Sequence, residues 1–142
     1  MTEKIKKTIA LGCTAVLINV VFSTRLIAAT SSVFVCEYES REDGRTRSKI
    51  QVKATGLPRG SYYVQVLAGG NMPVKSKPKK TNGRLALEFE FDSNSDDAIL
   101  EGKTEIPPNF TQGGFANGVI RKAKTNGQVK VFRSTQCRIQ QQ

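Results

Sequence analysis

The chain of 142 residues contains no histidine and no tryptophan. Without histidine, the Ser-His-Asp and Cys-His sets of nucleophilic enzymes and the histidine-bearing zinc sites are excluded. Carboxylates remain as the side chains for acid or base catalysis, as in glycosidases, which need two carboxyl groups across a cleft. We therefore predict a non-enzymatic protein without a cofactor, with a carboxylate-based hydrolase as an alternative.

Long apolar runs are also scarce, and the one present spans residues 9–22. It follows three lysines between residues 4 and 7 and precedes the small pair Ala28-Ala29, which is the layout of a cleavable secretory signal. We predict a signal peptide over 1–29, cleaved after Ala28 or Ala29, and a periplasmic or secreted domain over 30–142 without a transmembrane helix. An uncleaved signal anchor is the alternative.

Cysteine occurs three times, and removal of the signal leaves only Cys36 and Cys137. An even pair in an oxidising compartment favours a disulfide, here between the first and last strands. Free thiols or intermolecular pairing are the alternatives.

Residues 30–142 retain 18 of the 22 lysines and arginines and 11 of the 12 aspartates and glutamates, a formal charge of +7. Their length fits one domain with a modest core.

Four segments alternate apolar and polar residues with a period of two, the pattern of half-buried strands. They read VFVCEYES, KIQVKA, SYYVQVLA and RLALEFEFD and begin at residues 33, 49, 61 and 84. No helix is expected. The predicted core consists of Phe34, Ile50, Val52, Tyr62, Val64, Val66, Leu85, Leu87, Phe89, Phe91, Val129 and Val131.

Two Asn-Gly pairs predict tight turns. Asn126-Gly127 separates two apolar-rich segments and favours a two-residue type I′ hairpin, since both residues tolerate positive φ. Asn82-Gly83 predicts a second such turn. In the last strand the alternation breaks at Phe132, which indicates a bulge or bend there.

About seven short strands separated by Gly, Pro or Asn turns predict an all-β protein, a single β-sandwich. The segment TGLPRGSYYVQVLAGGN, residues 55–71, resembles the G-L-x-x-G-x-x-Y-x-V-x-V segment of fibronectin type III and related modules. The turn and strand positions of that segment match Gly56, Leu57, Gly60, Tyr62, Val64 and Val66, with the tyrosine one residue closer. The resemblance implies an immunoglobulin-like sandwich. In that family the segment lies near the end of the domain, whereas about seventy residues follow it here.

The loop DSNSDDAILEGK, which starts at residue 92, has the spacing of the first calcium ligands of an EF-hand at Asp92, Asn94 and Asp96. It departs from that motif at Asp97, where glycine is needed, and at Lys103, where a bidentate acid is needed. An acidic turn explains the loop more simply, so no metal site is predicted.

The most conspicuous charge cluster is VKSKPKKTNGR, residues 74–84, which has no acid. In an extended strand Lys75, Lys77 and Lys79 would share one side, and such lysines next to prolines protect a sheet edge from pairing with another strand. A second basic segment begins at residue 121. If the two segments meet, they form a face for an anionic partner. The candidate residues are Lys75, Lys77, Lys79, Lys80, Arg84, Arg121, Lys122 and Lys124.

A Pro- and Gly-rich stretch over residues 102–118 is a second candidate contact loop, with Phe110 and Phe115 among polar residues. The alternative is that these rings cap the core. Asn109 begins an N-glycosylation sequon, which is used only in eukaryotic secretion.

The predicted function is an exported binding or envelope-associated accessory module. Its expected partner is an anionic glycan, a lipid headgroup or an envelope protein. Nucleic acid is not expected, because no aromatic residue lies within the basic segment for base stacking. A structural protein that assembles by pairing an edge strand is a further alternative.

Overall fold

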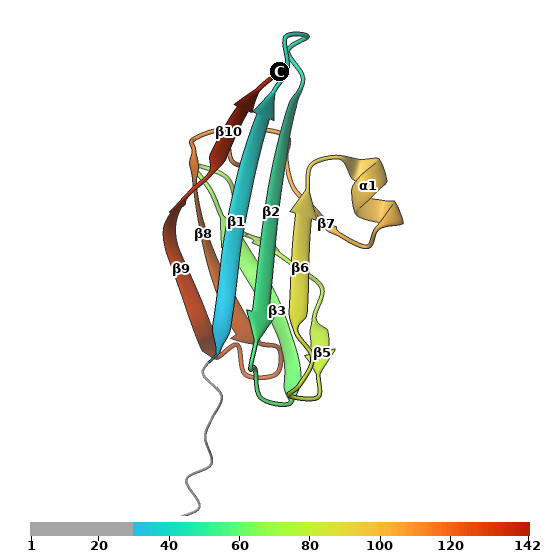
Figure 1. Cartoon of the computed structure of the whole chain (residues 1–142), viewed down its shortest axis with the longest axis vertical. Coiled ribbons are helices and arrows are strands. Elements are labelled where there is room, and N and C mark those ends of the chain that lie inside the picture. Colours follow the sequence, from blue (N-terminus) through green and yellow to red (C-terminus); the bar gives the residue numbers. More distant parts are fainter. Residues whose placement is uncertain (1–29) are drawn as a thin grey trace, which may run out of the picture.

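The computed structural model describes residues 30–142, so the predicted signal peptide and its anchor alternative lie outside the described residues. Two β-sheets make up the domain (Figure 1). The first sheet has the order β10-β1-β2-β6-β7, and the second has the order β4-β3-β8-β9, with β5 also paired to β3. The elements are β1 (Ser31–Ser40), β2 (Thr46–Thr55), β3 (Gly60–Leu67), β4 (Val74–Lys75), β5 (Lys79–Thr81), β6 (Leu87–Asp92), α1 (Ser95–Leu100), β7 (Thr104–Glu105), β8 (Phe115–Lys122), β9 (Gln128–Gln136) and β10 (Arg138–Gln141).

The core lies between the two sheets and consists of the alternate side chains that the period-two patterns predict. The first sheet contributes one face of β1, β2 and β6, and the second contributes one face of β3 and β8. The all-β prediction and the predicted strands are therefore confirmed. The largest fully buried side chains are Tyr62, Phe89, Phe91, Phe110, Ile50 and Leu57.

Two predicted core residues, Leu85 and Val131, are exposed instead. The alternation continues back to Leu85, but β6 begins only at Leu87, and the preceding turn directs Leu85 to solvent. In β9 the predicted irregularity is confirmed, because two residues of β9, Arg133 and Ser134, lie opposite the single residue Asn117 of β8, so β9 has one extra residue there. The bulge brings Phe132 inward, where its ring lies 5.1 Å from that of Phe34.

Neither Asn-Gly pair forms the predicted hairpin turn. Residues 123–127 make a longer loop between β8 and β9, and within the pair only Asn126 has a positive φ, of 54°. Asn82-Gly83 lies in the connection from β5 to β6, which belong to different sheets. A two-residue hairpin requires adjacent antiparallel strands in one sheet, so the pair cannot form one there.

The basic segment forms the predicted edge of the second sheet, but its lysines do not share one side. Lys75 on β4 is paired with Gln65, whereas Lys79 on β5 is paired with the buried Tyr62. Between β4 and β5 the pairing with β3 shifts by one residue. The side chains of β5 therefore alternate in the opposite sense to those of β4, which puts Lys75 and Lys79 on opposite faces of the sheet. Lys79 therefore points toward β6, where its ammonium donates to the carbonyl of Glu88 at 2.5 Å.

The helix α1 was not expected from the sequence. Its signals are nevertheless present, since Asn94 caps the first turn by accepting from the Asp96 N–H at 3.2 Å. Asp96 and Asp97 then lie at the positive end of the helix dipole. Gly102, with φ at +68°, follows the last turn. The predicted acidic turn is thus a short capped helix that projects beside β6 and β7 (Figure 1).

The predicted disulfide is confirmed. Cys36 in the middle of β1 is bonded to Cys137, with the two Cα atoms 4.6 Å apart. Cys137 is the single residue between β9 of the second sheet and β10 of the first. The bond therefore fixes the point at which the chain passes from one sheet to the other.

Residues 30–142 contain every strand and the whole core described above. Within them, no helix has both the length and the apolar character needed to cross a membrane.

Replacing both cysteines with alanine is expected to lower the free energy of unfolding by about 4 kcal/mol, because the bond closes a loop of 101 residues. Urea denaturation of the oxidised protein and the variant measures the difference. The variant should be insensitive to a thiol reductant, whereas the wild type should lose stability with it. Equal urea midpoints for wild type and variant would contradict the assignment of a stabilising role to the bond.

Candidate functional site

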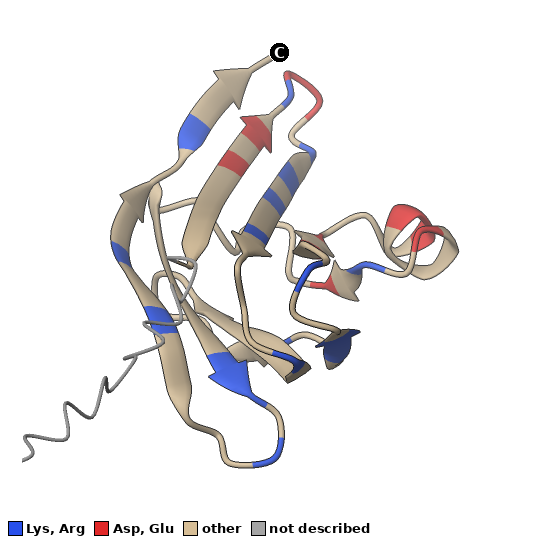
Figure 2. Ribbon diagram, turned by 60° about the horizontal axis from the view of Figure 1, so that its bottom comes forward, with Lys and Arg blue, Asp and Glu red and all other residues tan. Residues whose placement is uncertain are grey.

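Charge is divided between the two sheets. No strand of the second sheet contains an aspartate or glutamate, and the stretches 56–87 and 106–136 are free of them. These stretches carry 11 of the 18 lysines and arginines of residues 30–142. The first sheet and its connections hold all 11 acidic residues. In Figure 2 the lower end of the molecule accordingly shows blue segments without red.

The registers of the second sheet bring the two basic segments together at one end. Tyr62 on β3 lies between Lys79 on β5 and Lys122 on β8. The next residue toward the end, Ser61, is paired with Lys80 and accepts from the Ala123 N–H at 2.9 Å. We call the resulting cluster the basic end; its members are Arg59, Lys79, Lys80, Arg84, Lys122 and Lys124.

A shallow hollow of about 540 Å³ lies within the basic end. Arg59, Lys80 and Lys124 line it together with hydroxyl and amide groups of Ser61, Thr81 and Asn82. This combination offers an anion three cations, with the Ser61 hydroxyl and the Asn82 amide nitrogen as neutral donors, since the Thr81 hydroxyl donates within its own turn. Arg59 was not a predicted site residue, because it is isolated in the sequence and joins the lysines only through the fold.

The cations of the basic end have no partners of opposite charge within residues 30–142. Every cation that forms an ion pair there belongs to the first sheet or its connections, namely Arg45, Arg47, Lys49, Lys103 and Arg138. The charge of the first sheet is therefore balanced locally, whereas the basic end has no acidic partner within residues 30–142, since Lys79 donates only to a backbone carbonyl.

The other predicted cations lie farther from this end. Lys75 lies over Tyr63 on the outer face of the second sheet, with its ammonium 5.9 Å from the ring centroid. Arg121 is paired with the same tyrosine and donates to the carbonyl of Asn126 at 2.9 Å. Lys77 lies in the link between β4 and β5. Tyr63 is buried by these neighbours, so its ring is not presented for stacking.

Two of the three residues with calcium-ligand spacing, Asp92 and Asn94, have protein partners. Arg47 donates to both carboxylate oxygens of Asp92, at 2.9 and 2.7 Å, and also binds Asp97. Asn94 caps α1, as described above. Among residues 30–142 there is no group of three or more acidic or cysteine side chains that could hold a metal ion.

Asp92 is buried, with 2% of its side chain exposed. Burial by itself raises the pKa of this carboxyl, but hydrogen bonds from Arg47 and the Asn94 N–H, with attraction from Lys103, outweigh it. The pKa of Asp92 therefore lies below its usual value of 3.8. The same contacts raise the pKa of Arg47, and a hydrogen bond to Glu101 raises that of Lys103. Asp92 is thus a structural anion and not a proton donor near neutral pH.

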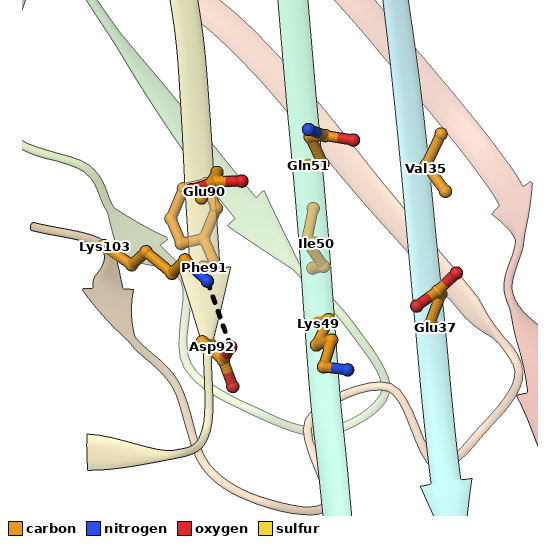
Figure 3. A pocket seen from close by; sticks show the side chains of 9 residues that line it. All are labelled: Val35, Glu37, Lys49, Ile50, Gln51, Glu90, Phe91, Asp92 and Lys103. Atoms are coloured by element: carbon orange, nitrogen blue, oxygen red, sulfur yellow. Dashed lines mark ion pairs between the residues drawn. The ribbon is translucent and has the colours of Figure 1, made fainter. Parts of the chain in front are cut away.

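The outer face of the first sheet has a small hollow of about 150 Å³ (Figure 3). Glu37, Glu90 and Asp92 contribute carboxylates to it from β1 and β6, with Lys49 and Lys103 between and beside them. Lys103 lies 3.7 Å from Asp92, and this ion pair is the dashed line in Figure 3. Because Asp92 is already bound to Arg47, it is not free to pair with a second carboxyl group as the hydrolase alternative requires.

The second candidate loop is divided by the fold. Phe110 belongs to the core, with 1% of its surface exposed, so its side chain is not available to a partner. Phe115 begins β8 and is 54% exposed. Asn109, the sequon residue, is exposed in the turn that precedes them.

No protein-family model, no curated protein and no solved structure matches the chain.

The Arg47–Asp92 pair predicts a pH dependence of stability. Because folding lowers the pKa of Asp92, its ionised form stabilises the fold above the unfolded pKa of about 4, and this contribution disappears as the pH falls through the lowered value. Asp92→Asn should cost about 3 kcal/mol at pH 7 and flatten the stability profile between pH 5 and 2. Thermal unfolding across that range measures both effects. The exposed Asp96→Asn is the matched control, and parallel profiles for the two variants would contradict the assignment.

Proposed function

We propose that this chain is an exported, immunoglobulin-like β-sandwich module that binds an anionic partner through its basic end and has no catalytic activity. The observation that supports this proposal is the division of charge between the sheets, with six cations gathered at one end and no acid among them. Such a concentration of unpaired charge produces a field that attracts anionic polymers and surfaces over a Debye length, about 10 Å at 0.1 M salt.

Edge protection accounts for only part of this charge. It explains Lys75 and Lys77 on the proline-rich edge of the second sheet. Lys122 and Lys124, by contrast, lie at the end of β8 and in the loop after it, and β8 is paired on both sides. Because their cations protect no edge, edge protection does not account for them, and we propose anion binding as their role.

Assembly through an added strand has less support. Within residues 30–142, the free edges of the second sheet are β9, which carries two register shifts, and the interrupted β4 and β5. Bulges, prolines and lysines at edges oppose the pairing of another strand. We therefore propose that the interaction is at the end of the sandwich and not along the edges of the second sheet.

Binding to immobilised dextran sulfate tests the proposal. The wild-type domain should bind and should be released as sodium chloride rises from about 0.1 to 1 M, because screening shortens the Debye length to about 3 Å. Each cation near an anionic surface contributes about 1 kcal/mol, so loss of three should weaken binding roughly a hundredfold. The test variant is Arg59→Gln/Lys80→Gln/Lys124→Gln.

A control variant removes the same charge elsewhere. It is Arg41→Gln/Arg133→Gln/Arg138→Gln, whose side chains are exposed and lie away from the basic end. It should retain most of the affinity. Equal loss in both variants would show that net charge alone drives binding, and absence of binding by the wild type would refute the proposal.

A further inference from the structure

An exposed leucine lies within the basic end. Leu85 is 62% exposed and directly follows Arg84 in the connection from β5 to β6. The alternation of β6 would bury a leucine at this position if the strand extended so far. The fold instead leaves an aliphatic side chain in solvent among cations.

The turn that carries Leu85 is held by its own hydrogen bonds. The Asn82 side chain accepts from the N–H groups of Arg84 and Leu85, at 2.9 and 3.2 Å. Thr81 donates its hydroxyl to the Leu85 carbonyl at 2.9 Å. Gly83 takes φ of +95°, a conformation that glycine adopts readily, and a Cβ at this position would lie 3.5 Å from the backbone nitrogen of Arg59. The protein therefore fixes this side chain outward.

The start of the domain lies at the same end. β1 begins at Ser31, which is paired with Thr55, four residues before Arg59 (Figure 1). The basic end is therefore also the end at which the domain follows the predicted signal peptide, residues 1–29.

We propose that the basic end docks on a phospholipid bilayer with anionic headgroups and that Leu85 inserts at the boundary between headgroups and acyl chains. This inference rests on the proposed function and names the partner. The cations supply attraction to the headgroups, and the leucine supplies an apolar contact. A soluble polyanion would use the cations but has no apolar layer for Leu85.

Co-sedimentation of residues 30–142 with vesicles tests the inference. The domain should bind vesicles of phosphatidylcholine with about 30% phosphatidylglycerol and not vesicles of phosphatidylcholine alone. Leu85→Ser should weaken vesicle binding about tenfold, as expected for loss of one buried leucine, and leave dextran sulfate binding unchanged. The matched control is Ile99→Ser, at a residue of α1 that is 76% exposed beside Asp96 and Glu101.

Tryptophan reporters give a second readout, because the chain has no tryptophan of its own. Leu85→Trp should show a blue-shifted emission with anionic vesicles and quenching by brominated acyl chains. Ile99→Trp should show neither, since α1 would remain in water.

The outcomes separate the two proposals. Binding to dextran sulfate without vesicle binding, or vesicle binding without an effect at Leu85, would overturn the membrane inference and leave polyanion binding intact. Failure to bind either probe would overturn both. Self-association that Leu85→Ser abolishes, without vesicle binding, would assign the basic end to a second copy and also overturn the inference.

Discussion

Burial of one face of each sheet is the constraint on which the rest of this structure depends. Strand alternation directs every second side chain into the space between the sheets, so charged residues must lie on the outer faces or at the ends. Two polar side chains between the sheets are held by hydrogen bonds to the backbone. Ser48 donates to the Pro108 carbonyl and accepts from the Thr111 N–H, and the Thr111 hydroxyl donates to the Glu37 carbonyl. These contacts connect the long segment before β8 to the first sheet.

The two sheets differ in how their charges are paired. On the first sheet, acids and bases alternate across neighbouring strands, as Glu39 with Lys49 and Arg47 with Asp92 show. Such pairs stabilise the sheet and leave little net field. The strands of the second sheet contain no acid, so their cations have no charged partner within the sheet. The first sheet therefore carries paired charges, whereas the second sheet carries an excess of positive charge.

Features that depend on the local alternation of side chains, or on the number of cysteines, could be predicted from the sequence. The alternating strands, the disulfide between Cys36 and Cys137 and the irregularity at Phe132 were all predicted. Features set by long-range pairing were not. The exposure of Leu85 depends on where β6 begins, and the role of Arg59 depends on the pairing of residues 60–62 with 79–81. The helix α1 could have been found from its Asn cap and following acids, which were interpreted as an acidic turn.

The disulfide has a mechanical consequence. β1 and β10 run parallel, and the two ends of the domain lie at opposite ends of the molecule (Figure 1). Tension applied between Ser31 and Gln142 would pass along six residues of β1, through the Cys36–Cys137 bond and along the last residues of the chain. All residues between the two cysteines, including the whole second sheet and the basic end, would lie outside this covalent path. A domain pulled from both ends would therefore keep its basic end outside the stretched part of the chain.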